Sequence, residues 1–102
     1  MKVYNKLVRD KIPDIIKSEG KYVKYKILNN EEYILQLNKK IVEEVNEYIN
    51  DNNVEELADI VEVVYGILNH MNISVEEFEK IRKEKAFKKG GFKEKIFLEE
   101  SE

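Results

Sequence analysis

Acidic residues recur in the middle of this 102-residue chain at spacings that could bring several carboxylates to one point. The stretch at residues 41–65 has the sequence IVEEVNEYINDNNVEELADIVEVVY. Two segments with helical apolar spacing flank the break at residues 50–53, whose asparagine and aspartate side chains favour turns and helix caps. Carboxylates gathered between two helices repel one another unless a cation neutralises them. The pattern therefore predicts a site for a divalent cation.

The spacing of the acidic residues predicts which of them face one another. In an antiparallel helical hairpin, residues equally far from the turn lie at equal heights. Glu47 then faces Glu56, and Glu44 faces Asp59 one helical turn further from the connection. Packed helices lie about 8–10 Å apart, so we expect these four carboxylates to converge between the two helices.

The position of each acidic residue on its helix supports this expectation. At about 100° per residue, Glu44 lies at the edge of the apolar stripe, Glu47 at its boundary and Glu43 nearly opposite. On the second helix, Glu56 falls within the apolar arc and Asp59 lies at its edge. A single acidic pair is the usual pattern of a solvated helix face, but an unpaired carboxylate in an apolar arc is costly. Two matched pairs beside apolar stripes therefore indicate a bound cation.

Composition restricts which cation this can be. The chain has no cysteine and one histidine, His70, so thiolate and multi-histidine sites within one chain are excluded. Oxygen ligands remain, and these suit Mg²⁺ or Mn²⁺. The net charge of −3 argues against nucleic acid as the main ligand. No apolar run approaches about 20 residues and no apolar signal core is present, so we expect a cytoplasmic protein that does not enter a membrane.

The elements that must position these residues are mostly helices. Pro13 fits a first helical turn, and Ser74 followed by Glu77 forms a capping box. The helices are predicted at residues 13–19, from a cap at 29–30 to about residue 49, at 54–71, and from 74 to about 89 before Gly90-Gly91.

Two further segments, residues 21–28 and 92–99, alternate well enough to predict strands that could pair with each other. The expected fold is mainly α: a single domain over residues 1–102, with two long antiparallel helices, a third C-terminal helix and a small peripheral β element. The apolar arc of the helix at 54–71 is wider than one neighbouring helix would cover, which predicts burial against a second subunit.

Basic residues form a second group. Lys6 and Arg9 lie near the N-terminus, and Arg82, Lys85 and Lys89 share one helical face before the glycine pair. Taken singly, each is an ordinary solubilising side chain. Beside an acidic metal site, Lys6, Arg9, Lys85 and Lys89 are candidates for binding substrate phosphates, because Mg²⁺ usually shares its ligands with phosphate oxygens.

These residues resemble a known family. Glu43-Glu44-x-x-Glu47 followed by Glu56-x-x-Asp59 is similar to the acidic signature of the MazG-like all-α nucleoside triphosphate pyrophosphatases. The family binds Mg²⁺ through such residues and cleaves between the α- and β-phosphates, giving a nucleoside monophosphate and pyrophosphate. The resemblance implies that Mg²⁺ is bound by Glu44, Glu47, Glu56 and Asp59. It also implies that Glu43 assists as an outer ligand or by positioning water.

Two flanking motifs extend the resemblance over residues 4–98. The opening YNKLVRDKIP at 4–13 and the closing K-x-x-x-K-G-G-F at 85–92 resemble the small, phosphoribosyl-ATP pyrophosphohydrolase-like branch of the superfamily. Members of the family complete their helical bundle by forming dimers or tetramers. Where they commonly carry arginine before Gly-Gly-Phe, this chain has Lys89, which keeps the charge but loses bidentate geometry.

The expected function is Mg²⁺-dependent hydrolysis of nucleoside triphosphates, with a house-cleaning role on non-canonical or surplus nucleotides. Glu43 or Glu47 is expected to accept the proton of the attacking water, and the basic residues to stabilise the leaving pyrophosphate. One alternative is a phosphoribosyl-ATP pyrophosphatase of histidine biosynthesis, which shares the chemistry. The other is a non-catalytic helical interaction module.

Overall fold

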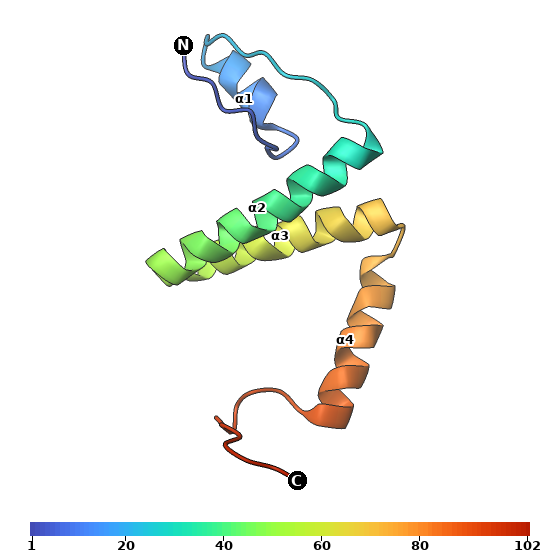
Figure 1. The fold of residues 1–102 in the computed structure, drawn as a ribbon. Coiled ribbons are helices and arrows are strands. Elements are labelled where there is room, and N and C mark those ends of the chain that lie inside the picture. Colours follow the sequence, from blue (N-terminus) through green and yellow to red (C-terminus); the bar gives the residue numbers. More distant parts are fainter.

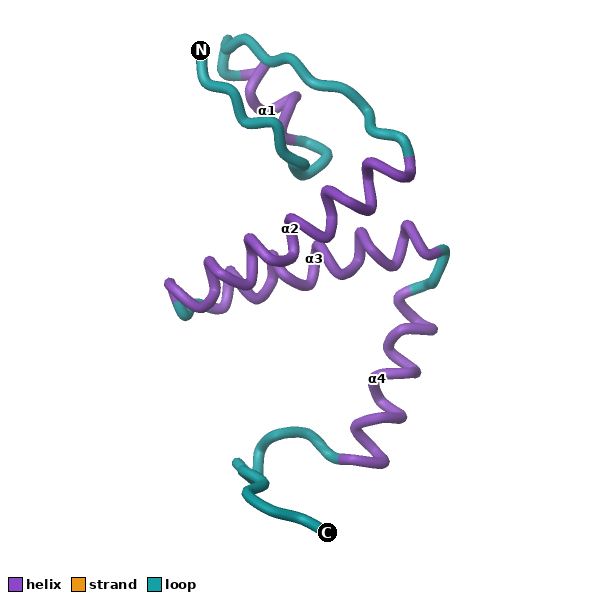
Figure 2. The backbone as a smooth tube through the Cα atoms, in the orientation of Figure 1, coloured by secondary structure: helices purple, strands orange, loops and turns teal.

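The computed structural model describes residues 1–102 and contains four helices and no strand (Figures 1 and 2). The two longest helices, α2 and α3, lie side by side as an antiparallel hairpin, and α4 leaves the hairpin at the end of α3. The mainly α class predicted from the sequence is confirmed. The helices span Ile12–Ser18 (α1), Asn30–Asp51 (α2), Val54–Met71 (α3) and Val75–Lys89 (α4).

The turn between α2 and α3 is shorter than the four-residue break expected from the sequence. Asn50 and Asp51 continue α2, which ends where Asn52 adopts a left-handed conformation with φ of 53°. Asparagine tolerates this conformation better than most residues. Asn53 then caps α3, because its Oδ1 accepts a hydrogen bond from the Glu56 backbone N–H at 3.0 Å. The tight turn fixes the register of the two helices.

The starts of α2 and α4 follow the predicted caps. The Asn29 Oδ1 atom accepts a hydrogen bond from the Glu32 N–H at 2.9 Å at the start of α2. At the start of α4 the Ser74 Oγ atom accepts one from the Glu77 N–H at 3.1 Å. These side chains satisfy backbone donors that a helix leaves unpaired at its N-terminus. The sequence therefore located the starts of α2 and α4 correctly.

The predicted β element is absent. Residues 21–28 and 92–99 form no strand, and Figure 1 shows them at opposite ends of the molecule, the first beside α1 and the second beyond α4. Alternating apolar residues give only a tendency to form a strand, because a strand also needs a neighbouring strand to pair with its backbone N–H and C=O groups. The prediction of two paired strands was wrong because the helices between them hold the segments apart.

The core lies along the seam between α2 and α3 and is small. Leu37, Val63 and Leu68 are its buried apolar residues, and the fourth buried residue of the chain is Glu44. Gly66 allows the helices to approach closely, since a Cβ atom there would lie 2.9 Å from the Leu37 Cδ2 atom. The two helices are thus in close contact at this seam, and the seam also buries the carboxylate of Glu44.

Outside this seam the chain is extended. Its radius of gyration is 18.0 Å, whereas a compact chain of this length has about 13 Å. α1 packs against no other helix, and α4 contacts only α3. None of the four helices combines the length and the apolar composition needed to cross a bilayer.

Candidate metal centre

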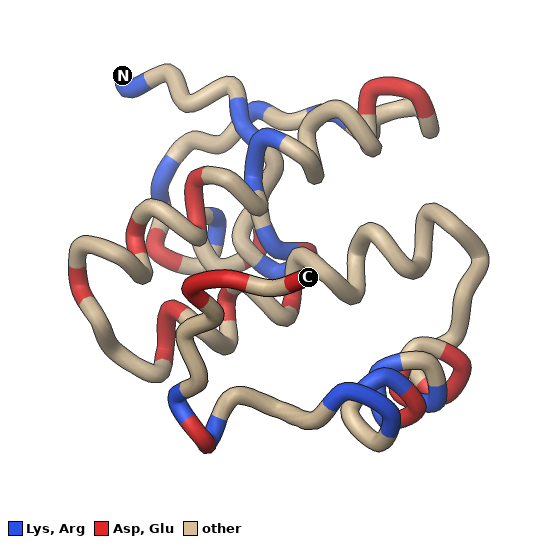
Figure 3. Tube along the Cα trace, turned by 60° about the horizontal axis from the view of Figure 1, so that its bottom comes forward, with Lys and Arg blue, Asp and Glu red and all other residues tan.

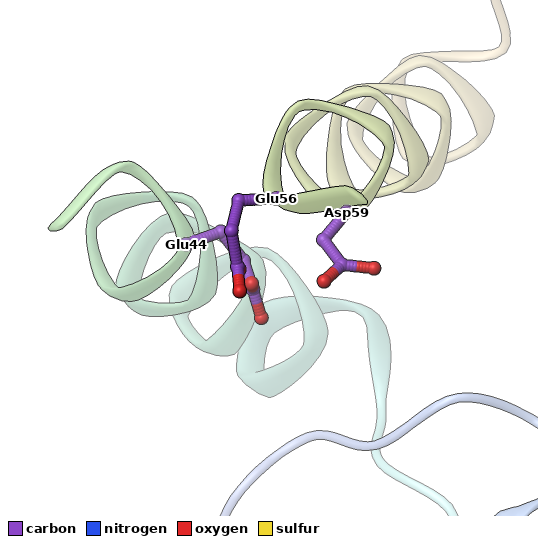
Figure 4. Close-up of side chains that lie close together, drawn as sticks. All are labelled: Glu44, Glu56 and Asp59. Carbon is purple, nitrogen blue, oxygen red and sulfur yellow. The ribbon is translucent and has the colours of Figure 1, made fainter. Parts of the chain in front are cut away.

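Three carboxylates meet between α2 and α3. Glu44 comes from α2, Glu56 and Asp59 come from successive turns of α3, and one oxygen of each lies within 4.8 Å of the others. Figure 4 shows the side chains of Glu44 and Glu56 lying beside each other, with Asp59 extending into the same space. Three of the four carboxylates predicted to converge therefore do so. Glu47 is exposed and does not belong to this group.

The cluster contains buried oxygens without partners. The Glu44 side chain is 9% exposed, and Oε2 of Glu44 and Oε2 of Glu56 are both buried without a hydrogen-bond donor. Buried polar atoms in folded proteins are almost always paired, and an unpaired carboxylate oxygen is among the most costly exceptions. A bound cation would satisfy both oxygens. The carboxylates of the cluster are therefore suitable ligands for a metal ion.

The electrostatics of the cluster agree with this fit. Burial raises the pKa of Glu44 above its ordinary value, and the nearby charge of Glu47 raises this pKa further, while Lys40 acts in the opposite direction. Burial also raises the pKa of Glu56, again followed by the charge of Glu47. Both groups therefore resist ionisation in the absence of a cation. Although Glu47 lies outside the converging group, it belongs to the same electrostatic cluster.

Lys40 is a member of the site that the sequence did not single out. Its Nζ atom lies 3.5 Å from Oε1 of Glu44 and 3.8 Å from Oε1 of Glu43, and its side chain is 19% exposed. The signal was present, because Lys40 precedes Glu44 by four residues, the spacing at which helical side chains meet. Lys40 gives the cluster part of its neutralisation, but it leaves Oε2 of Glu44 unpaired.

Two of the predicted phosphate ligands lie at this cluster. The Arg9 Nη2 atom donates a hydrogen bond to Oδ1 of Asp59 at 2.6 Å. The Lys6 Nζ atom lies 3.6 Å from Oε1 of Glu43. The N-terminal basic residues are thus beside the carboxylates of their own chain, where they could bind an anion held at the metal centre.

The other two predicted ligands, Lys85 and Lys89, are not brought to the cluster. They lie on α4, which starts beyond the far end of α3 and points away from the hairpin (Figure 1). At 1.5 Å per residue, the helix from Glu56 to Met71 alone spans about 22 Å. Acidic and basic residues are also intermixed along the sequence of α4 (Figure 3).

The donor set defines what the centre can do. Three carboxylates with unpaired oxygens suit a hard divalent cation, and the guanidinium of Arg9 offers paired N–H donors that match phosphate oxygens. Metal and phosphate ligands within a few ångströms of each other are the equipment of phosphoryl-transfer chemistry. Comparisons with models of protein families, with curated proteins and with solved structures found no match for the chain.

Proposed function

We propose that this chain is a MazG-like nucleoside triphosphate pyrophosphohydrolase that acts on non-canonical or surplus nucleotides in the cytoplasm. The observation that supports the proposal most directly is the pair of buried, unpartnered oxygens of Glu44 and Glu56 beside Asp59. Such a pair lowers stability in a protein without a cation. Its presence at the seam of the hairpin is therefore best accounted for by a function that needs a cation there.

The metal ligands in this proposal are Glu44, Glu56 and Asp59, with Glu47 as a fourth carboxylate at the exposed side of the cluster. The cation is Mg²⁺, with Mn²⁺ as a substitute of similar chemistry. When bound, it supplies neutralisation of the triphosphate charge and a lowered pKa for water at the site.

In the reaction, the oxygen of a water molecule forms a bond to the α-phosphorus as the bond to the bridging α–β oxygen breaks. The products are a nucleoside monophosphate and pyrophosphate. Of the two candidate bases, Glu47 is better placed than Glu43 to accept the proton of the water. Glu43 is engaged by Lys6 and Lys40, whereas Glu47 has no ion pair and is exposed.

The leaving pyrophosphate requires positive charge near the cluster. Arg9 and Lys6 are within reach in the same chain. We assign Lys85 and Lys89 to the site of another copy of the chain, because α4 carries them away from their own cluster. The basic residues then contribute electrostatic stabilisation as charge develops on the leaving group.

The assignment to another copy agrees with the exposed apolar surface. Large apolar side chains on α3 remain exposed along one face, and these are Val54, Leu57, Val61 and Tyr65. A single chain with three buried apolar residues has little core to stabilise it. We therefore propose that the active form is a homodimer or homotetramer in which this face is covered.

Pyrophosphate release from a nucleotide panel tests the function. The panel contains canonical and oxidised or deaminated nucleoside triphosphates together with phosphoribosyl-ATP, each with and without Mg²⁺. We expect Mg²⁺-dependent turnover of at least one nucleoside triphosphate, and a loss of at least about 100-fold in Glu56→Gln, corresponding to about 3 kcal/mol. If phosphoribosyl-ATP is the preferred substrate, the proposed substrate class is wrong and the proposed reaction stands.

Glu55→Gln is the matched control for Glu56→Gln. Both residues lie in the first turn of α3, so the two substitutions change the charge at the helix N-terminus equally. Glu55 is exposed and outside the cluster, and its replacement should leave turnover unchanged. Absence of any turnover, or equal turnover in the two variants, would favour the non-catalytic interaction module instead.

A further inference from the structure

The N-terminal arm, defined as residues 4–11, crosses the acidic hairpin and contacts both of its helices. Lys6 pairs with Glu43 on α2, and Arg9 pairs with Asp59 on α3. The arm thus places two positive charges against an acidic cluster whose buried oxygens lack donors. Asp59 is at once the partner of Arg9 and one of the three converging carboxylates.

Little else holds the arm in place. No residue of the arm or of α1 is buried. Leu7 is the one half-buried residue of the arm, Ile12, Pro13 and Ile16 of α1 are half-buried, and α1 packs against no other helix. The side chains of the two ion pairs are 39–56% exposed. Exposed ion pairs contribute little to stability and are screened by salt. The arm can therefore leave the hairpin at small cost.

A divalent cation at the cluster changes the balance. It would lie within a few ångströms of the Arg9 guanidinium, because both bind the carboxylate of Asp59. Like charges at that distance repel, and the repulsion is stronger where the carboxylates are partly buried. Since the cation also satisfies the unpartnered oxygens of Glu44 and Glu56, which the arm does not reach, the cation has the advantage in this competition.

We propose that the N-terminal arm is an exchangeable counter-ion: a divalent cation entering the Glu44–Glu56–Asp59 cluster displaces Arg9 and Lys6, which are then free to bind the phosphates of the nucleotide. The inference rests on the proposed function and adds an order of events to it. The cation loads first, and loading creates the anion-binding groups. Without the cation, Arg9 and Lys6 stay paired with Asp59 and Glu43, so the charges of the arm are occupied.

Calorimetric titration of the full chain with Mg²⁺ alone, and separately with Mn²⁺ alone, tests the competition. We expect Arg9→Gln to bind the cation about two- to fivefold more tightly than the wild type, because a weak competing ion pair is removed. Arg82→Gln is the matched control. Arg82 is the other arginine of the chain and also forms an exposed ion pair, with Glu79, but it lies on α4 outside the cluster.

A label at position 3, one residue before the arm, separates displacement of the arm from a general charge effect. The chain has no cysteine, so Val3→Cys, at a position 78% exposed, accepts a nitroxide at a single site. We expect Mg²⁺ to sharpen the nitroxide spectrum as the arm is released. In the Val3→Cys/Arg9→Gln double variant the spectrum should already be sharp without Mg²⁺ and change little on its addition.

The outcomes distinguish the arm from the metal centre. If the wild type binds no cation, the metal centre and the exchange are both refuted. If the wild type binds the cation but Arg9→Gln binds no more tightly and the label spectrum does not respond, the metal centre stands and the exchange is refuted. Tighter binding in Arg9→Gln with a responsive label supports the exchange.

Discussion

Glu44 is a carboxylate buried where α2 and α3 meet. It is the one ionisable residue among the four that the chain buries, and its Oε2 atom has no partner. Lys40 neutralises one side of the group. Such an arrangement costs stability in the absence of a cation. At the scale of single residues, the molecule gives up stability to keep a charge between its two main helices.

The raised pKa of Glu56 predicts how stability depends on pH without metal. Because the folded state binds this proton more firmly than the unfolded chain, the free energy of unfolding falls as pH rises above the ordinary carboxylate pKa of about 4.3. Glu56→Gln mimics the protonated group. It should therefore be more stable than the wild type at pH 7 to 8, and the difference should vanish as pH falls towards 4.3.

Urea unfolding at a series of pH values in the presence of a chelator measures this difference. Glu55→Gln again serves as the control, and its stability relative to the wild type should not grow with pH in the same way. A wild type more stable than Glu56→Gln at pH 8 would mean that the carboxylate is not held in a repelling cluster.

The sequence predicted the convergence of Glu44, Glu56 and Asp59, because a tight antiparallel turn fixes the heights of residues on both helices. It did not predict that Glu47 would stay exposed, since height and angle leave the direction of a long side chain open. The pairing of Arg9 with Asp59, 50 residues apart, depends on the path of a chain segment with no regular structure. No periodic pattern encodes such a contact.

At the scale of elements, the turn between α2 and α3 aligns the site. The Asn53 Oδ1 atom caps α3 through the backbone N–H of Glu56, so the cap is attached directly to a proposed metal ligand. Asn53→Ala should lower the free energy of unfolding by about 1 kcal/mol and should also weaken Mg²⁺ binding, because the first turn of α3 frays. Urea unfolding and calorimetry measure the two effects.

Asn50→Ala is the control for the cap. Asn50 is exposed within α2 and lies in the same turn region, but it caps no helix. Its replacement should leave both stability and Mg²⁺ affinity close to the wild type. Equal effects of the two substitutions would show that the cap does not position Glu56.

Helices were predicted more successfully than strands for a physical reason. Periodic apolar positions and capping side chains act within one segment, and they located α2, α3 and the start of α4. A strand depends on a partner, and residues 21–28 and 92–99 have none within the chain. Their alternating pattern indicates a tendency to form strands, but the helices between them hold the two segments too far apart to pair.

At the scale of the whole molecule, the extended shape and the exposed apolar face of α3 predict self-association. Val61 lies in the middle of that face and is 46% exposed. Val61→Glu should place a charge in the interface and lower the molar mass measured by light scattering to that of one chain, 12.1 kDa. If the phosphate-binding residues of α4, Lys85 and Lys89, act in another copy's site, pyrophosphate release should fall when the assembly dissociates.

Glu62→Gln changes the adjacent exposed position of α3. It is the control for a substitution on this helix outside the apolar face, and it should leave the assembly intact. A wild type that is already a single chain in solution at assay concentrations would contradict the proposed assembly. In that case Lys85 and Lys89 could not reach the carboxylate cluster of any copy of the chain.

The central claim is that Glu44, Glu56 and Asp59 form a divalent cation site, and calorimetric titration of Mg²⁺ into wild type, Glu44→Gln and Glu62→Gln tests it most directly. We expect saturable binding by the wild type and by Glu62→Gln, and an affinity at least about tenfold lower for Glu44→Gln, a difference of about 1.4 kcal/mol. Equal affinities for all three proteins, or no saturable binding by any of them, would contradict the account.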